Sequence, residues 1–231
     1  MPESLITVFF DVGDTLIRIR APLYSLYTRV INRHKNNGFH EDEVRAAMRG
    51  IADRFPLMLD GHFRYSDGWF EQYIFVLLEK IECPHPWDGL RQGLFDLFDD
   101  PETFEVFSDV TPCLKAIHNL GLRTAVISNW GYRLSRLLER LLPESGFQTV
   151  ISSAEVEREK PDPGIFHLAL SRMGNEPDRC IHVGDSLEND VEGAVSAGLY
   201  SVLLDRPGAH LDVVNRISSL EDLPSYLEKM R

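Results

Sequence analysis

Short apolar runs without polar interruption recur along this chain, and segments with helical periodicity separate them. The runs lie at residues 5–10, 124–127, 149–151, 180–183 and 201–204. Because polar residues do not alternate within them, both faces of each strand should be buried, as in a parallel sheet. Helical spacing of apolar residues lies between the runs, for example over residues 134–141 and 191–195. The alternation predicts an α/β fold with a doubly wound, Rossmann-like parallel sheet.

Residues from about 21 to 98 follow a different pattern, in which helical spacing occurs four times with no strand between. The apolar positions are Leu23, Leu26, Tyr27 and Val30; Val44, Met48, Ile51 and Phe55; Phe70, Tyr73, Ile74, Leu77 and Ile81; and Leu90, Leu94, Leu97 and Phe98. Pro22 and an acidic segment after the fourth helix favour extended connections at the two edges. We expect residues 1–17 and 105–231 to form the core, and residues 18–104 to form an inserted, all-helical domain.

Charge and cysteine content exclude several classes of protein. The chain has 36 acidic and 24 basic side chains and a net charge of −12, with no run of Lys or Arg, so nucleic acid and anionic membranes are poor partners. The first residues lack the basic segment and long apolar run of a signal peptide or membrane span, so we expect a cytoplasmic protein. Cys83, Cys113 and Cys180 form no CxxC pair and read as reduced packing thiols.

Reactive side chains directly follow three of the expected strands, namely Asp11, Ser128 and Asp185. Ligands of open α/β sheets bind at the carboxyl ends of the strands, so these side chains should converge on one crevice. There Asp11 would be a nucleophile toward phosphorus, forming an aspartyl-phosphate. The structural alternatives are that Asp11 caps the turn after its strand and that Ser128 caps the next helix.

Asn129 and Lys160 would complete a phosphate site together with Ser128. Ser128 and Asn129 would direct a hydroxyl and backbone N–H groups at phosphoryl oxygens. Lys160 precedes Pro161 on a loop, where it would place a positive charge beside both Asp11 and the phosphate. The alternative for Lys160 is a solvated surface lysine. Asp162 should cap the helix that follows the loop.

The spacing of Asp185 and Asp190 suits magnesium. Mg²⁺ prefers oxygen ligands and usually takes one or two carboxylates, waters and a substrate phosphate, so Asp11, Asp185 and a backbone carbonyl near Gly13 form a plausible set. Asp190 would hold a metal-bound water or Lys160, and it would also favour the start of a helix. His182 lies inside an apolar strand and reads as a hydrogen-bonded core histidine.

In this order, the segments VFFDVGDTL, AVISN, EKPDPGIF and HVGDSLEND resemble the four signature motifs of the haloacid dehalogenase-like (HAD) hydrolase superfamily. The helical insert resembles the C1 cap domain of its subfamily I. The resemblance covers residues 5–204 and implies a Mg²⁺ cofactor and hydrolysis of small phosphorylated metabolites. By position it implies these roles: Asp11 as nucleophile, Ser128 as phosphate-binding hydroxyl, Lys160 as charge-balancing lysine and Asp185 as metal ligand.

One position departs from the phosphatase pattern. Phosphatases of the family usually carry a second Asp two residues after the nucleophile, as general acid and then base. Gly13 stands there in this chain, and Asp14 is one position late. General acid–base help is worth about 10²–10⁴-fold, so a slow phosphatase or a substitute donor is expected. With its D-V-x-D-T-L first motif, the chain resembles the haloacid dehalogenase-like hydrolase domain-containing 3 type.

Three functions remain open from the sequence. The first is a Mg²⁺-dependent phosphatase, a monomer or weak homo-oligomer. The second is a haloacid dehalogenase, in which Asp11 attacks carbon without a metal, although dehalogenases lack the GD of the fourth motif and Asp185 is present here. The third is a non-catalytic protein that binds phosphate and metal. Substrate choice would reside in the loop of residues 60–67, where His62, Arg64 and Tyr65 would face the substrate.

Overall fold

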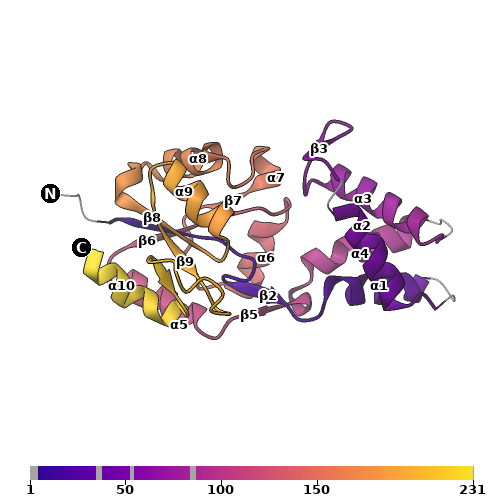
Figure 1. The fold of residues 1–231 in the computed structure, drawn as a ribbon, viewed down its shortest axis with the longest axis horizontal. Helices are drawn as coiled ribbons and strands as arrows, with labels where there is room; N and C mark the ends of the chain where they lie inside the picture. Colours follow the sequence, from indigo (N-terminus) through magenta and orange to yellow (C-terminus); the bar gives the residue numbers. More distant parts are fainter. Residues whose placement is uncertain (1–4, 35–37, 53–54, 84–86, 231) are drawn as a thin grey trace.

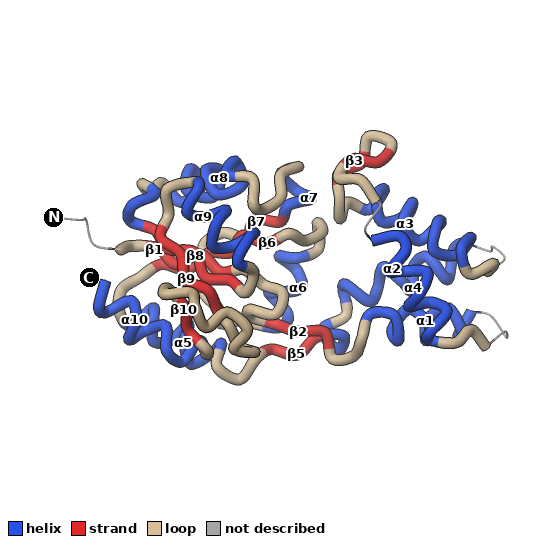
Figure 2. The backbone as a smooth tube through the Cα atoms, viewed as in Figure 1, coloured by secondary structure: helices blue, strands red, loops and turns tan. Residues whose placement is uncertain are grey.

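The computed structural model describes residues 5–34, 38–52, 55–83 and 87–230. A sheet with helices on both faces occupies one end of the molecule, and a group of helices occupies the other (Figure 1). Two antiparallel strands run between these parts (Figure 2).

The sheet has six parallel strands in the order β10-β9-β8-β1-β6-β7. Their bounds are β1 Thr7–Phe10, β6 Arg123–Ser128, β7 Val150–Ser152, β8 Cys180–Gly184, β9 Tyr200–Leu204 and β10 Arg216–Ile217. The five predicted strands and the doubly wound α/β fold are thus confirmed. Strand β10 was not predicted, because two residues are too few to form a recognisable run.

Both faces of the sheet are buried, as the apolar runs predict. In β1, Val8 and Phe10 belong to one apolar cluster and Phe9 to another, since successive side chains of a strand point to opposite faces. Helices α5, α6 and α10 cover the first face, and α8 and α9 cover the second (Figure 1). The flanking helices are α5 Val110–Asn119, α6 Leu134–Leu141, α7 Ser153–Val156, α8 Pro163–Met173, α9 Gly193–Ser196 and α10 Leu223–Met230, with short turns η1 Pro101–Thr103, η2 Pro177–Arg179 and η4 Leu220–Asp222.

The insert contains the four predicted helices, which pack around their own buried cluster. Their bounds are α1 Leu23–His34, α2 Glu41–Ala52, α3 Asp67–Lys80 and α4 Trp87–Asp99. The insert is not all-helical, however, because β3 (Met58–Leu59) and β4 (His62–Phe63) form an antiparallel hairpin. Asp60 and Gly61 connect these strands with positive φ angles of 47° and 80°. Asp-Gly is a strong hairpin signal, and it was missed in favour of the helical pattern.

The connection between sheet and insert is a two-stranded antiparallel ribbon of β2 (Ile17–Ile19) and β5 (Phe104–Val106). The boundaries expected at residues 18 and 104 fall inside it. Arg18 and Glu105 form an exposed ion pair of 2.8 Å across the ribbon. Within the described ranges, no helix combines the length and apolar character needed to cross a bilayer.

Candidate active site

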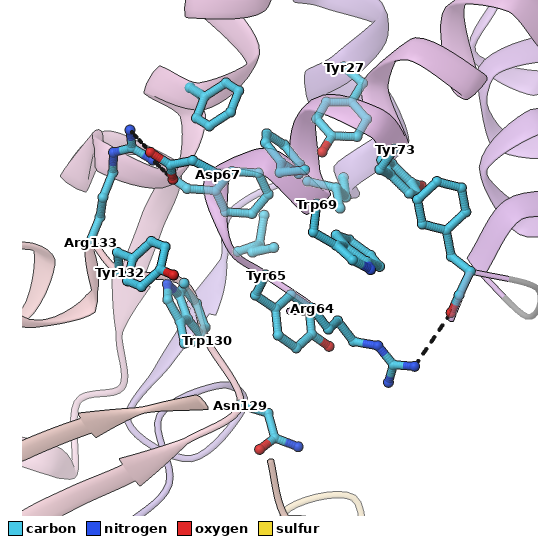
Figure 3. Close-up of a pocket in the computed structure, with 17 residues that line it drawn as sticks. Tyr27, Arg64, Tyr65, Asp67, Trp69, Tyr73, Asn129, Trp130, Tyr132 and Arg133 are labelled. Carbon is cyan, nitrogen blue, oxygen red and sulfur yellow. Dashed lines mark hydrogen bonds and ion pairs between the residues drawn. The ribbon is translucent and has the colours of Figure 1, made fainter. Parts of the chain in front are cut away.

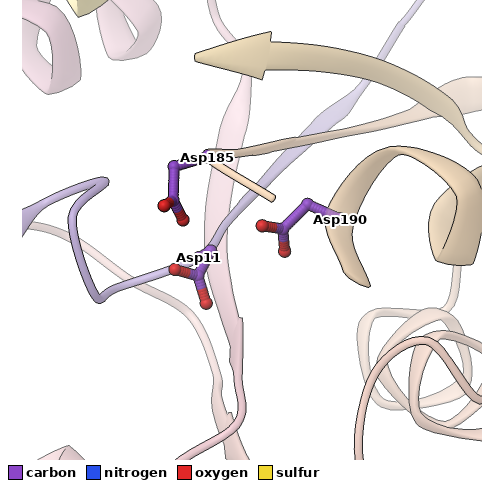
Figure 4. Close-up of side chains that lie close together, drawn as sticks. All are labelled: Asp11, Asp185 and Asp190. Atoms are coloured by element: carbon purple, nitrogen blue, oxygen red, sulfur yellow. The ribbon is translucent and has the colours of Figure 1, made fainter. Parts of the chain in front are cut away.

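Side chains from distant parts of the chain meet at the carboxyl edge of the sheet. The Ser128 hydroxyl donates a hydrogen bond of 2.9 Å to Asp11 Oδ1, and Lys160 Nζ donates one of 2.6 Å to the same atom. Carboxylate oxygens of Asp11, Asp185 and Asp190 lie within 4.8 Å of one another, with the three groups turned toward a common point (Figure 4). The geometry brings together the carboxylates, hydroxyl and ammonium that the sequence motifs contain.

The backbone after β1 explains why Asp11 points into this edge. The Asp11 N–H still donates to the Val183 carbonyl at 2.9 Å, so strand pairing with β8 continues one residue beyond β1. Asp11 is buried, with 7% of its surface exposed. Its carboxylate accepts from Ser128 and Lys160, which rules out the alternative of a simple turn cap. Burial raises the pKa of Asp11, and the Lys160 ammonium opposes this rise.

Ser128 is the last residue of β6 and Asn129 follows it, and their side chains make different contacts. Ser128 does not cap a helix, since α6 begins at Leu134. The Asn129 amide pairs with the Lys160 backbone: Nδ2 donates to the Lys160 carbonyl at 2.9 Å, and Oδ1 accepts from the Lys160 N–H at 2.8 Å. Asn129 therefore fixes the loop that carries Lys160, a contact that only the folded arrangement of two loops reveals.

Lys160 is almost completely buried, so the alternative of a solvated surface lysine is wrong. Its ammonium lies between Asp11 and Asp190, and it donates to Asp190 Oδ1 at 2.5 Å. Burial would lower the pKa of Lys160, but the negative charges of Asp11 and Asp190 raise it. Lys160 is thus protonated and balances both buried carboxylates. Asp162 caps α8 by accepting from the Gly164 N–H, as predicted.

Both carboxylate oxygens of Asp190 take part in hydrogen bonds, and Oδ1 is the one that accepts from Lys160. Oδ1 also lies 2.9 Å from His182 Nε2, and Oδ2 accepts from the Ser186 N–H at 3.0 Å. Burial would raise the pKa of Asp190, but Lys160 and His182 lower it strongly. Burial lowers the pKa of His182, which favours the neutral imidazole. The segment after β8 is a π-helical turn, η3 (Leu187–Glu192), and Ser186 is its cap.

Asp185 is the exposed member of the carboxylate group. Dense surrounding atoms partly withdraw its carboxyl group from solvent, and the charges of Asp11, Asp190 and Asp14 add to this effect, so its pKa rises to about 7. Asp14 is exposed and has a φ angle of 51°. It follows Gly13 in a turn in which the Asp14 N–H donates a hydrogen bond of 2.8 Å to the Ile17 carbonyl. Concentrated negative charge of this kind is what a divalent cation would neutralise.

A cavity of about 440 Å³ lies between the insert and the loop after β6 (Figure 3). Its walls are mainly aromatic and aliphatic. Of the three residues predicted to face a substrate, Arg64 and Tyr65 line the cavity and His62 does not. The remaining lining residues are Ile19, Leu23, Tyr27, Phe55, Asp67, Trp69, Phe70, Tyr73, Phe95, Phe98, Asn129, Trp130, Gly131, Tyr132 and Arg133.

Two arginines join the insert to the core beside this cavity. Arg133 donates to both carboxylate oxygens of Asp67, at 2.8 and 3.1 Å, and its Nε lies 2.9 Å from Asp99 Oδ2. Arg64 donates to Glu159 at 3.0 Å, next to Lys160 in the chain. Sequence reasoning missed Arg133 and Glu159, because each acquires its partner only when the insert meets the core.

Comparison with known proteins agrees with the arrangement of these motifs. A family model described as a haloacid dehalogenase-like hydrolase matches residues 7–198. The haloacid dehalogenase-like hydrolase domain-containing protein 3 of Danio rerio is 30% identical, over 96% of both chains. A glyceraldehyde 3-phosphate phosphatase of Methanopyrus kandleri is 34% identical over 52% of this chain and 51% of its own. The crystal structure of a HAD phosphatase from Thermococcus onnurineus superposes with a TM-score of 0.68 at 24% identity, covering 96% of this chain and 98% of that one.

Proposed function

Because the chain belongs to the haloacid dehalogenase-like hydrolase family, we propose that it is a Mg²⁺-dependent hydrolase of small phosphate esters that forms an aspartyl-phosphate on Asp11. The observation that carries this proposal is the buried row of Asp11, Lys160 and Asp190 beside the exposed Asp185. A relative named as a phosphatase of a small phosphorylated metabolite supports the same class of substrate.

Each chemical task falls to a residue of this arrangement. The Asp11 carboxylate attacks phosphorus, forming a new O–P bond as the ester oxygen departs with the electron pair of the broken bond. Lys160 favours the ionised form of Asp11 against the effect of burial and would supply positive charge to the phosphoryl oxygens. The Ser128 hydroxyl orients Asp11 in the free site by donating its one proton to Asp11 Oδ1, and it would turn that proton to a phosphoryl oxygen when the ester binds. Water then attacks the phosphorus of the aspartyl-phosphate, which releases phosphate and restores the Asp11 carboxylate.

The carboxylate group fits a Mg²⁺ cofactor by the chemistry of its oxygen donors. We assign Asp11, Asp185 and the Gly13 carbonyl as ligands, and Asp190 as a supporting residue, since Lys160, His182 and the Ser186 N–H engage its oxygens. When bound, the ion would neutralise the charge that develops on the phosphoryl group. This assignment also accounts for the crowded negative charge around Asp185.

We further propose that residues 18–104 act as a cap domain over the site. The cavity supports this proposal, because residues of the insert and of the loop after β6 line it together. Closure of a cap excludes water and selects the substrate.

Gly13 favours a second candidate, a protein that binds phosphate and metal without turnover. A side chain can be accommodated at this position, since a Cβ on Gly13 would lie 3.7 Å from Trp130 Cζ3, an ordinary contact. Restoration of a carboxylate there therefore tests whether the remaining site is competent. Dehalogenation receives less support, because that reaction makes no use of the carboxylate at Asp185.

The test measures hydrolysis of p-nitrophenyl phosphate and of a simple alkyl phosphate with Mg²⁺ and with a chelator. Asp11→Asn should lower p-nitrophenyl phosphate hydrolysis about a thousandfold or more. Gly13→Asp should raise alkyl phosphate hydrolysis by about 10²–10⁴-fold, whereas the matched control Gly13→Asn should not. If neither wild type nor Gly13→Asp hydrolyses either ester, the binding protein is the correct reading. Halide release from haloacids that is indifferent to chelation would establish the dehalogenase instead.

A further inference from the structure

One wall of the cavity is a row of aromatic rings presented by α3 and the residues just before it. The ring of Trp69 lies 5.9 Å from that of Tyr65 and 5.8 Å from that of Tyr73, the latter pair stacked at 10°. Phe55 meets Trp69 and Tyr73 edge-on, at 5.1 and 5.5 Å. The spacing of four residues places Trp69 and Tyr73 on one face of α3, and Tyr65 joins the row from the turn before the helix. A planar ring could bind here through the offset-stacked and edge-to-face contacts that aromatic groups prefer.

The opposite wall comes from the core, from the loop that follows Ser128. Trp130 and Tyr132 line the cavity on this side (Figure 3). Asn129, which adjoins Ser128 in the chain, also lines it. The indole of Trp130 lies beside Gly13, two residues from Asp11, since a Cβ placed on Gly13 would be 3.7 Å from Trp130 Cζ3. The aromatic cavity therefore borders the position where other family phosphatases hold the proton donor for the leaving group.

The charged side chains in the lining are all paired, within the residues that the structure describes. Arg64 bonds to Glu159, and Arg133 bonds to Asp67. A charged occupant would therefore have to compete with an existing ion pair. At about 440 Å³, the cavity falls within the range of about 300–1,000 Å³ typical of small-molecule sites. These features suit a small, uncharged ring.

The absence of a side chain at Gly13 selects the same kind of leaving group on independent grounds. A phenol has a pKa of about 10, so a phenolate departs without prior protonation. Aliphatic alcohols resemble water, with a pKa of about 15.7, and need a proton donor to leave. The lining of the cavity and the lack of a proton donor at Gly13 thus both favour an aryl leaving group.

We propose that the physiological ester is a small aryl phosphate whose uncharged aromatic ring binds between the Tyr65–Trp69–Tyr73 row and Trp130; this rests on the proposed phosphatase function. Asp11 forms the O–P bond while the aryl O–P bond breaks. The phenolate leaves with the electron pair and takes a proton from water. Hydrolysis of the aspartyl-phosphate then releases inorganic phosphate and returns a proton to solvent.

Binding of phosphonates, which cannot be hydrolysed at their P–C bond, separates ring recognition from turnover. Titration calorimetry with Mg²⁺ compares benzylphosphonate, its saturated counterpart cyclohexylmethylphosphonate, and methylphosphonate. Aromatic contacts are expected to make benzylphosphonate bind about three- to tenfold more tightly than the saturated counterpart. In turnover, 2-naphthyl phosphate should exceed phenyl phosphate in kcat/KM, although their leaving phenols have similar acidity.

Two variants remove rings from the core wall. Trp130→Leu should weaken benzylphosphonate binding about tenfold and leave methylphosphonate binding unchanged. Tyr132→Leu provides a second test with less risk to folding, because Tyr132 is 51% exposed. The matched control is Tyr200→Leu, which removes an exposed aromatic residue at the start of β9 and should change neither affinity.

The outcomes distinguish failure of the aryl phosphate proposal from failure of the phosphatase function on which it rests. If methylphosphonate binds but the ring ligands bind no better, or if n-octyl phosphate is preferred over phenyl phosphate, the aromatic proposal is overturned while the phosphatase stands. If methylphosphonate does not bind and no ester is hydrolysed, both proposals are overturned.

Discussion

At the scale of single residues, the charges of the site depend on Lys160. One buried ammonium balances two buried carboxylates, Asp11 and Asp190. Asp185 adds a further negative charge at the exposed side of the group, and Asp14 contributes another nearby. Negative charge in the site therefore exceeds positive charge, which would favour binding of a cation and should destabilise the protein without one.

The first prediction is that the stability of the metal-free protein depends on pH through Asp185. The pKa of Asp185 is raised from 3.8 to about 7, so the folded metal-free protein retains a proton that the unfolded chain releases. Its free energy of unfolding should therefore fall as pH rises from about 4 to 7. Asp185→Asn should match wild type near pH 4 and be the more stable of the two at pH 8 without metal.

Thermal unfolding with and without Mg²⁺ measures this effect. At pH 8 Mg²⁺ should stabilise wild type much more than Asp185→Asn. The control Glu188→Gln removes an exposed charge from the same segment and should behave like wild type. Equal pH dependence of wild type and Asp185→Asn would contradict the prediction.

Much of the candidate site follows from the sequence, because its residues lie directly after predicted strands. Asp11, Ser128 and Asp185 are carried to one edge by parallel pairing alone. Partners that depend on how two loops approach each other could not be predicted. The amide of Asn129 bonding the Lys160 backbone and the contact of His182 with Asp190 are of this kind.

At the scale of elements, α3 and α4 are joined to α6 through one side chain. Arg133 precedes α6, whereas Asp67 begins α3 and Asp99 ends α4. Its guanidinium also lies 5.1 Å from the ring of Phe95. A planar group with five N–H donors can serve all of these partners at once, which an ammonium cannot.

The second prediction is that Arg133→Met loosens the insert from the core. Acrylamide quenching of tryptophan fluorescence should increase, since Trp69 and Trp130 line the cavity beside this contact. The KM for phenyl phosphate should rise about two- to fivefold, consistent with a partly exposed ion pair worth about 0.5–1 kcal/mol. Arg136→Met, an exposed change one turn later in α6, is the matched control.

A double-mutant cycle completes this experiment. The effects of Arg133→Met and Asp67→Asn should be less than additive, because each change breaks the same contact. Strict additivity, or an equal effect of Arg136→Met, would show that the ion pair does not hold the insert.

Long elements were more predictable than most short ones, although the three-residue β7 was also indicated by its apolar run. The four helices of the insert contain 12 to 14 residues each, enough for a 3.6-residue period to repeat. Strands β2, β3, β4, β5 and β10 contain two or three residues, too few for alternation to be visible. Only chemistry specific to the turn, at Asp60 and Gly61, could have indicated the β3–β4 hairpin.

At the scale of the whole molecule, Asp109 joins segments from both ends of the chain. Arg206 donates to both of its carboxylate oxygens, at 2.8 and 3.0 Å, and also to the Thr15 carbonyl at 2.9 Å. The Ser219 hydroxyl and the Leu220 N–H donate to Asp109 as well. The network links the turn after β1, the start of α5 and the segment before α10.

The third prediction is that Asp109→Asn destabilises the protein by about 3 kcal/mol, because it leaves Arg206 without its charge partner. Burial alone would raise the pKa of Asp109, but hydrogen bonding to Arg206 outweighs this effect and lowers the pKa. The stabilisation is therefore present above about pH 4 and lost as the pH falls below it.

Urea unfolding of wild type and variant at pH 7 and at pH 3 measures the difference. The difference in free energy of unfolding between wild type and Asp109→Asn should be smaller at pH 3 than at pH 7. The exposed change Asp212→Asn should produce no difference from wild type at either pH. A difference independent of pH would show that lost packing, rather than charge, causes the destabilisation.

The central place of β1 has a consequence for synthesis on the ribosome. Thr7 pairs with Arg123 on one side and Cys180 on the other, so β1 emerges long before either neighbour exists. At about 5–20 residues per second, its second neighbour follows roughly 10 to 35 seconds later. Helices α1–α4 emerge in that interval with a buried cluster of their own. The nascent chain therefore exposes the apolar β1 while the helical insert is already free to condense.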